Sequence, residues 1–459
     1  MTEEIRQENK MGTVPVNRLL LSMAIPMIIS MLVQALYNVV DSIFVAQVSE
    51  NALTAVSLAF PMQNLMIAVA SGMGVGVNAL LSRSLGEKNF DRANKAALNG
   101  LLLSFIGFVL FLLVGLFGAR AFMAAQIDIE EIVTYGTQYV QICTIFSFGM
   151  FFQIMLERLL TSTGRTIYTM ITQSTGAVIN IVLDYILIFG HFGFPRLEVR
   201  GAAIATVIGQ TAAAVFAFVL NKKVNRDISL RVKGFRPEKR ILGHILAVGI
   251  PSMVMMSIGS VMTFCMNKIL AVFSSTAVAV FGVYFKLQSF VIMPVIGLNN
   301  GMVPIVAYNY GARKRKRITK TIQYSVFYAV GIMLLGLFII QANPEGLMRL
   351  FEASEDMMGI GVPALRIVSL NFIFAGICII LSSSFQALGN GILSMFVSIL
   401  RQVVVLIPVA YLLSKLGNVD LVWWAFPIAE IASLVFCLLF YRRMYRKIIR
   451  PLPEEGETL

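Results

Sequence analysis

Charged residues are scarce in this sequence of 459 residues, of which only 13% are Asp, Glu, Lys or Arg. A soluble domain carries about 25% charged residues. Hydrophobic residues make up 58% of the chain. These proportions exclude a soluble enzyme and predict a polytopic membrane protein that is all α-helical, because apolar helices are the usual way to cross a bilayer.

Histidine and cysteine, the residues of most metal and disulfide sites, are also rare. The two histidines, His191 and His244, lie far apart in the chain. All four cysteines lie inside apolar runs without metal or disulfide spacing, and we expect small buried hydrophobes rather than metal ligands. They are Cys143, Cys265, Cys378 and Cys437.

Two further features are missing from the sequence. No glycine-rich phosphate loop precedes a helix, so we expect no built-in ATPase. As a polytopic membrane protein of this composition, the chain is also expected to have no cofactor and no enzymatic activity. The first ten residues, MTEEIRQENK, lack the basic-then-apolar order of a cleaved signal peptide, so we expect the first helix to be retained.

Apolar runs of membrane-spanning length recur along the whole chain, about twelve in all. They lie at 18–46, 52–81, 96–118, 132–160, 167–190, 201–221, 241–273, 277–310, 321–341, 359–387, 392–414 and 420–441.

The net charge of +13 comes from basic residues in alternate short connections, at 83–95, 222–240 and 311–317, and in the tail after Tyr441. The connections between them are poor in Lys and Arg. This distribution is the positive-inside pattern of a membrane protein and does not indicate nucleic-acid binding. We therefore expect both termini and the 222–240 segment to be cytoplasmic.

The two halves of the sequence are a repeat with an offset of 225 positions. The matched pairs are Pro26 and Pro251, Ala52 and Ala277, Phe60 and Phe285, Gln63 and Gln288, Gly72 and Gly297, Gly76 and Gly301, Gly86 and Gly311, Arg92 and Arg317, and Gly164 and Gly389.

This repeat predicts the domain organisation. Residues 1–221 form an N-lobe of six helices, 222–240 a basic linker, and 241–459 a C-lobe of six helices with a basic tail. An even number of helices per half relates the lobes by a pseudo-two-fold axis along the membrane normal, with a substrate cleft between them that opens to each side in turn.

The spanning segment 24–46 carries Gln34, Asn38 and Asp41 on one helix face, and Pro26, which should act as a hinge. A carboxylate inside a spanning helix is costly and marks a functional site by default. Alternatively, the three polar residues on this face serve to hold the helix against its neighbours. Asp184, four residues after Asn180, should lie at a depth like that of Asp41.

These polar residues have apolar counterparts in the second half, so the fold does not require them. Two buried carboxylates with amides nearby can share one proton, because burial and like charge oppose a second negative charge. They can equally hold a sodium ion through oxygen ligands, and the residues do not separate the two. The aligned pairs are Asp41 and Met266, Asn180 and Val405, and Asp184 and Val409.

Other polar residues in apolar runs are candidates for either a functional or a structural role. Glu157 is either a coupling group or a local partner of Arg158 near a helix end. Thr206 can supply an oxygen ligand or serve close helix packing. Arg401 and Glu430 could pair with each other.

Methionine, aromatic and amide residues on the cleft-lining segments suit apolar cationic ligands, although ordinary packing is the alternative for each. The predicted cleft set is Gln34, Tyr37, Asn38, Phe60, Gln63, Met255, Met256, Met262 and Phe285.

Several motifs together resemble those of MATE multidrug transporters, over the whole chain, with the DinF/MepA-like bacterial branch most similar. They are the first-helix run Pro26–Val45, GMGVGVNALLSRSLGEKNFDRA (72–93), ERLLTSTGR (157–165), NIVLD (180–184) and GAAIAT (201–206).

This resemblance implies a monomeric multi-pass protein of the bacterial inner membrane that exports drugs and organic cations in exchange for protons or sodium, and so contributes to antibiotic resistance. The N-lobe coupling site of that branch matches Asp41, Asn180 and Asp184. Glu157 falls where many members have Asn, and Thr206 matches a proposed ligand position. Two alternatives are a flippase of lipid-linked precursors or polysaccharide exporter of a related superfamily, and a membrane receptor or scaffold.

Overall fold

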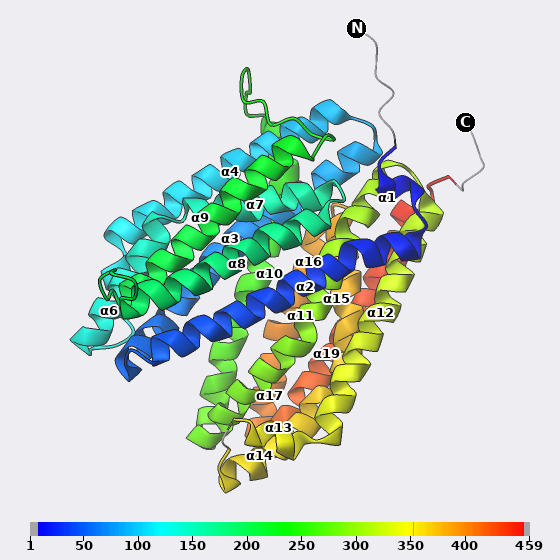
Figure 1. The fold of residues 1–459 in the computed structure, drawn as a ribbon. Helices are drawn as coiled ribbons and strands as arrows, with labels where there is room; N and C mark the ends of the chain where they lie inside the picture. Colours follow the sequence, from blue (N-terminus) through cyan, green and yellow to red (C-terminus); the bar gives the residue numbers. More distant parts are fainter. Residues whose placement is uncertain (1–7, 352, 454–459) are drawn as a thin grey trace. The chain divides into compact units, whose positions relative to one another are not determined.

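Helices joined by turns and loops make up the part of the chain that the computed structural model describes, residues 8–351 and 353–453 (Figure 1). Ten of the described helices are long and apolar enough to cross a membrane. Two bent helix pairs raise the number to twelve if each pair is one span. The prediction of an all-α polytopic membrane protein is confirmed.

The helices follow one another with short connections. In chain order they are α1 (Lys10–Thr13), α2 (Val16–Ala46), α3 (Glu50–Gly86), α4 (Phe90–Phe117), α5 (Ala119–Ala124), α6 (Glu130–Ile145), α7 (Phe148–Ser162), α8 (Thr166–Phe189), α9 (Val199–Lys223), α10 (Lys239–Ala271), α11 (Ser275–Gly311), α12 (Arg315–Ala342), α13 (Pro344–Arg349), α14 (Glu355–Ser369), α15 (Phe372–Ala387), α16 (Gly391–Ile399), the π-helix η1 (Leu400–Leu406), α17 (Ile407–Ser414), α18 (Val419–Trp423), α19 (Ala425–Met444) and the π-helix η2 (Tyr445–Ile449).

The chain folds into two compact units whose boundaries lie inside helices. Residues 29–253 form one unit, here called the N unit. The described residues up to Ile28 and from Val254 onward form the other, the C unit. The boundaries therefore fall in α2 and α10, just after Pro26 and Pro251.

These boundaries differ from those of the predicted lobes, which were separated at the linker 222–240. Close packing at two glycines explains why the units divide inside α2 and α10. In the N unit, a Cβ added at Gly76 of α3 would lie 2.1 Å from the main-chain oxygen of Ile245, in the first half of α10. In the C unit, one added at Gly301 of α11 would lie 2.8 Å from the main-chain nitrogen of Ala24, in α2. The N-terminal part of α10 thus packs against α3, from the first half of the sequence. The N-terminal part of α2 packs against α11, from the second half.

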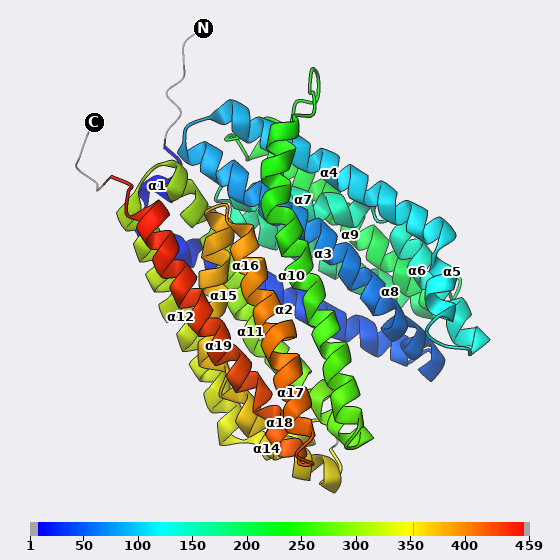
Figure 2. The same cartoon turned by 180° about the vertical axis from the view of Figure 1, so that it is seen from behind.

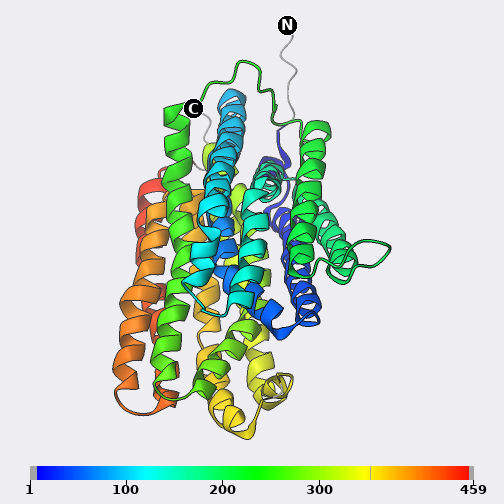
Figure 3. The same cartoon turned by 90° about the vertical axis from the view of Figure 1, so that its left-hand side faces the viewer.

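The N unit is built around α3, which packs against α4, α6 and α7, while α8 and α9 run side by side (Figure 1). Its core cluster includes Met66, Phe111, Tyr139 and Phe151. The 222–240 segment leaves α9 and leads into α10 (Figure 3). In the C unit, α11 packs against α12, α14 and α15, and α19 packs against α15 and η1 (Figure 2).

The sequence repeat is also a repeat of backbone geometry. The bends between α6 and α7 and between α14 and α15 are 48° and 47°. Left-handed residues also recur at the offset of 225, with φ of 56° at Lys88 and 57° at Arg313. Gly164 and Gly389 have φ of 85° and 83°. The two halves therefore share one local fold, including turns that hydropathy does not reveal.

An ion pair joins η1 to α19 in the C unit, as the sequence predicted. Arg401 Nη1 lies 3.3 Å from Glu430 Oε1, and the two side chains are 29% and 7% exposed. The corresponding positions of the N unit are Gly176 and Ala205, which carry no charge. The pair is therefore specific to the C unit.

Breaking this pair should destabilise the protein. Arg401→Met leaves the Glu430 carboxylate without its cation in a buried place, which typically costs about 3–5 kcal/mol. Adding Glu430→Gln removes the charge that was left, so the double variant should melt closer to the wild type than Arg401→Met does. Thermal melting in detergent measures both. Equal melting of the single and double variants would show that the charge pair is not what stabilises this contact.

Candidate functional site

Two acidic side chains from different helices meet inside the N unit. The carboxyl groups of Asp41 on α2 and Asp184 on α8 lie within hydrogen-bonding reach of each other. Asp184 is fully buried. Two ionised carboxylates repel and cannot donate to each other, so this contact requires a bound proton or a cation.

One oxygen of each of these carboxyl groups has no hydrogen-bond partner among the described residues. The Oδ1 atoms of Asp41 and Asp184 are buried, and no described residue donates a hydrogen bond to either. Buried polar atoms of folded proteins are nearly always paired, so such orphans require an explanation. Unpartnered oxygens in a buried carboxyl pair are suited to binding a cation or a proton.

Asn180 and Thr206 hold the Asp184 carboxyl from the other side. With the Asn180 amide oriented so that both of its ends have partners, its nitrogen donates to Asp184 Oδ2 at 3.0 Å. Its oxygen accepts from the Thr206 main-chain nitrogen at 2.9 Å and from the Thr206 hydroxyl at 3.2 Å. Both residues are buried. The structure therefore brings Asp41, Asn180, Asp184 and Thr206 together.

Glycines explain how α8 and α9 come close enough for these contacts. A Cβ added at Gly209 of α9 would lie 2.8 Å from the main-chain oxygen of Gly176 and 3.0 Å from the Asn180 Cβ. Small residues at such crossings let helix backbones approach closely in membranes. Any side chain larger than glycine here would push Thr206 away from Asn180.

Tyrosines and a glutamine surround the pair. Tyr37, Tyr139 and Cys143 lie close enough to Asp41 for its charge to act on them. Gln63 Nε2 donates to the Tyr139 hydroxyl at 3.0 Å. The sequence predicted Tyr37 and Gln63 but missed Tyr139, because a single tyrosine in an apolar run has no distinguishing signal.

A chain of polar side chains also connects α2 to α8. Ser30 donates to Gln173 Oε1, and Gln173 Nε2 donates to Gln34 Oε1 at 3.3 Å. The sequence missed Gln173, although it lies seven residues before Asn180 and hence on the same helix face. Asn38, on α2, is exposed.

Glu157 lies in a separate polar group. Its Oε1 accepts from Gln153 Nε2 at 3.0 Å and from the Thr172 hydroxyl at 3.1 Å, and its side chain is buried. Thr172 precedes Asp184 by twelve residues of α8, about 18 Å along the helix. The predicted coupling residues are therefore divided, with Glu157 apart from the other four.

The predicted substrate-cleft residues divide between the two units. Gln34, Tyr37, Asn38, Phe60 and Gln63 belong to the N unit, and Met255, Met256, Met262 and Phe285 to the C unit. Phe60, Met256 and Phe285 expose 52%, 46% and 40% of their surfaces. Within the C unit, Gln386 Nε2 donates a hydrogen bond to the Met255 sulfur at 3.4 Å. As one binding surface, the set stays a prediction.

The residues at the Asp41 pair are oxygen donors. Within residues 8–351 and 353–453, no group of three or more His, Cys, Asp or Glu side chains is placed to hold a metal ion. The free ligand atoms at the Asp41 pair are carboxylate oxygens, because the Asn180 oxygen and the Thr206 hydroxyl bond to each other. Hard oxygen donors suit hard cations rather than soft metals.

A comparison with protein families matches the MatE model twice, at residues 26–186 and 251–412. The two matches are the two copies of the repeat and together cover most of the chain. The chain belongs to the MatE family. The long apolar helices and this membership make it a multi-pass membrane protein.

Relatives and solved structures of the family match nearly the whole chain. Multidrug export protein MepA of Staphylococcus aureus (strain MSSA476) is 26% identical, covering 93% of this chain and 94% of the relative. MepA of Staphylococcus haemolyticus (strain JCSC1435) is also 26% identical, covering 89% of each. An outward-facing multidrug resistance MATE family transporter of the MOP superfamily is 25% identical, with a TM-score of 0.91 over 97% of this chain and 99% of that one.

Proposed function

We propose that this MatE-family protein is a multidrug efflux transporter. It exports lipophilic and cationic small molecules, with no enzymatic step and no nucleic-acid partner, by antiport with protons or sodium. The proposal is supported by the similarity over nearly full length to the multidrug export protein MepA and to a multidrug resistance transporter. Its natural setting is the bacterial inner membrane, where it acts as a monomer surrounded by lipid.

The observation that carries the coupling part of this proposal is the buried contact between Asp41 and Asp184. An ion drives transport only if it binds the two access states differently. The contact couples α2 to α8, so binding a proton or sodium ion favours one position of α2 and its release favours another. Pro26, inside α2, weakens the backbone where such a bend would occur.

A retention assay with fluorescent dyes tests the substrate class. Cells that overproduce the protein should accumulate less ethidium or quaternary ammonium dye than cells without it, because carboxylate and aromatic side chains attract lipophilic cations. Equal dye retention together with movement of anionic lipid precursors would support a flippase instead.

Accessibility labelling tests the orientation, with both termini and the 222–240 segment in the cytoplasm. Ser229 in this segment is exposed, and its main-chain nitrogen donates to Asn94 Oδ1 at 2.7 Å. Ser229→Cys, in a background without the native cysteines, should resist impermeant thiol reagents in intact cells and react after lysis. Labelling in intact cells would reverse the proposed topology.

A further inference from the structure

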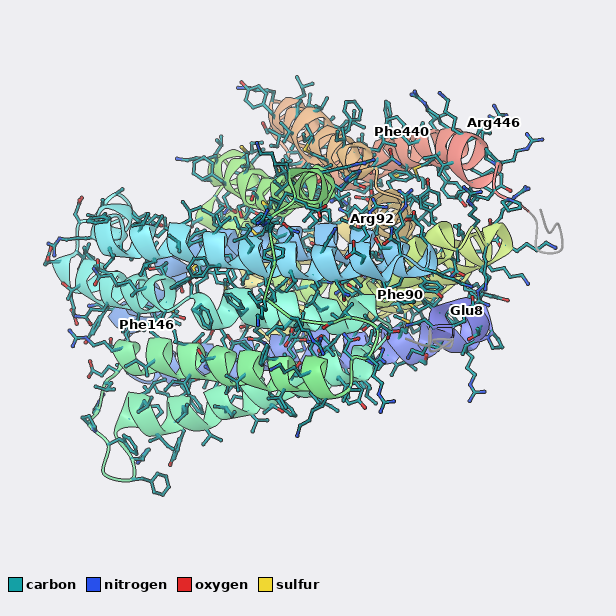
Figure 4. The ribbon with its side chains drawn as sticks, turned by 90° about the horizontal axis from the view of Figure 1, so that it is seen from above. Glu8, Phe90, Arg92, Phe146, Phe440 and Arg446 are labelled. Atoms are coloured by element: carbon teal, nitrogen blue, oxygen red, sulfur yellow. The ribbon has the colours of Figure 1, made fainter. Side chains whose placement is uncertain are left out.

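Four basic residues gather where α19 passes into η2. Arg442, Arg443, Arg446 and Lys447 line a hollow of about 400 Å³ together with Leu439. All four basic side chains are exposed. No acidic side chain of the described part of the chain forms an ion pair with any of them. Figure 4 labels Arg446 of this cluster.

The spacing of these residues disfavours the helix unless an anion is present. Arg442 and Arg446 are four residues apart, as are Arg443 and Lys447. Like charges at this spacing face each other on a helix and destabilise it. A bound anion between the side chains would remove this repulsion.

An apolar stripe leads along α19 into the cluster. Ile428, Ile431, Val435, Leu438 and Leu439 recur every three or four residues and are each 42–54% exposed. The stripe spans twelve residues from first to last, and its eleven steps along the helix cover about 16 Å. This matches the thickness of one leaflet, since the hydrocarbon core of a bilayer is about 30 Å thick.

Aromatic side chains mark the interfacial level at the end of the stripe. The rings of Tyr441 and Tyr445 lie 6.3 Å apart, and Arg315 Nη2 donates to the Tyr445 hydroxyl at 3.1 Å. Tyrosines are enriched at the headgroup level of membrane proteins. The basic cluster thus lies where lipid phosphates lie, directly beyond a surface that suits acyl chains.

We propose that this cluster binds the headgroup of an anionic glycerophospholipid, whose acyl chains lie along the stripe of α19. Basic clusters beside spanning helices attract anionic lipids. The repeat does not require the site, because the corresponding N-unit positions are Ala217, Phe218, Asn221 and Lys222. The site is independent of the proposed export activity.

Native mass spectrometry of the full-length protein, with dioleoyl phosphatidylglycerol and dioleoyl phosphatidylcholine offered in equal amounts, tests this proposal. The wild type should retain the anionic lipid preferentially. Arg442→Gln/Arg446→Gln should weaken its binding roughly 30-fold, since each interfacial basic residue contributes about a fivefold gain. Arg443→Gln/Lys447→Gln should behave similarly.

The matched control is Lys222→Gln/Lys223→Gln, at the end of α9 in the other half of the repeat. It should keep the wild-type preference. All variants should melt at the wild-type temperature or slightly above it, because the changed side chains are exposed and the arginine variants remove like-charge neighbours. Equal retention of the two lipids by the wild type, or an unchanged preference in both arginine variants, would overturn the proposal. Inorganic phosphate displacing the lipid at equal concentration would also overturn it, in favour of a free-anion site.

Discussion

Replacing Asp41 with asparagine is expected to reduce gradient-driven efflux to the level of cells without the protein. In the wild type, the contact between Asp41 and Asp184 needs a proton or a cation. An asparagine amide at position 41 would donate directly to the Asp184 carboxylate, so the contact would form without any ion. Movement of α2 would then no longer depend on the gradient.

This loss should be specific to coupling. Asp41→Asn keeps the size of the side chain, so the variant should insert and melt like the wild type, and it should still exchange labelled drug across the membrane without a gradient. Asp184→Asn should behave similarly. Asn180→Ala should have a milder effect, because it removes one donor to Asp184 but leaves both acids.

The exposed Asp128, in the connection before α6, provides the control. Asp128→Asn removes an acid of the same type and should leave efflux unchanged. If Asp41→Asn cells still export drug against a gradient at the wild-type rate, Asp41 has only a structural role.

Replacing Gly76 with valine is expected to prevent stable folding of the N unit. The added Cβ would lie 2.1 Å from the Ile245 main-chain oxygen and 3.0 Å from its carbonyl carbon. A main-chain atom cannot rotate away as a side chain can, so α10 would have to separate from α3. Overpacking of this kind costs about 1–3 kcal/mol where neighbours can adjust and more where they cannot.

Membrane-inserted yield and thermal melting measure this effect. Gly301→Val should be similarly harmful, because Gly301 meets the backbone of α2 in the C unit at 2.8 Å. Gly331→Ala, in α12, is the control, because a Cβ there meets nothing within 4 Å. It should be neutral or stabilising by about 0.5–1 kcal/mol. Wild-type melting of Gly76→Val would show that α3 and α10 do not pack closely.

The sequence predicted the helical class, the approximate spans and the repeat, because a bilayer demands long apolar helices and loop charge follows topology. It did not predict the bends. The runs 132–160 and 359–387 each become two helices in the structure. Hydropathy reports how apolar a segment is and does not register a change of direction within it.

The unit boundaries also escaped prediction. The linker 222–240 is the most polar interior stretch, so it suggested a division there. The division inside α2 and α10 depends on which helix each half contacts, and Gly76 and Gly301 determine this through space rather than through local sequence.

The sequence singled out Asp41 and Asp184 because carboxylates in apolar helices are costly and therefore conspicuous. Asp41 and Asp184 meet as their matching depths implied. Glu157 was grouped with them by family position, yet its carboxylate bonds to Gln153 and Thr172. Glu157 contacts α8 at Thr172, about 18 Å along the helix from Asp184. Matching a family motif does not show which part of a neighbouring helix a residue contacts.

Purified protein in sealed proteoliposomes, with a proton or sodium gradient imposed across the membrane, tests most directly whether the protein is an ion-coupled exporter. Antiport at Asp41 and Asp184 predicts that a lipophilic cation moves against its own gradient while the ion gradient lasts and stops when an ionophore dissipates it. Asp41→Asn protein in matched vesicles should show no such movement. Concentrative transport that persists after both gradients are dissipated, or that is equal in wild type and Asp41→Asn, would contradict coupling at this site.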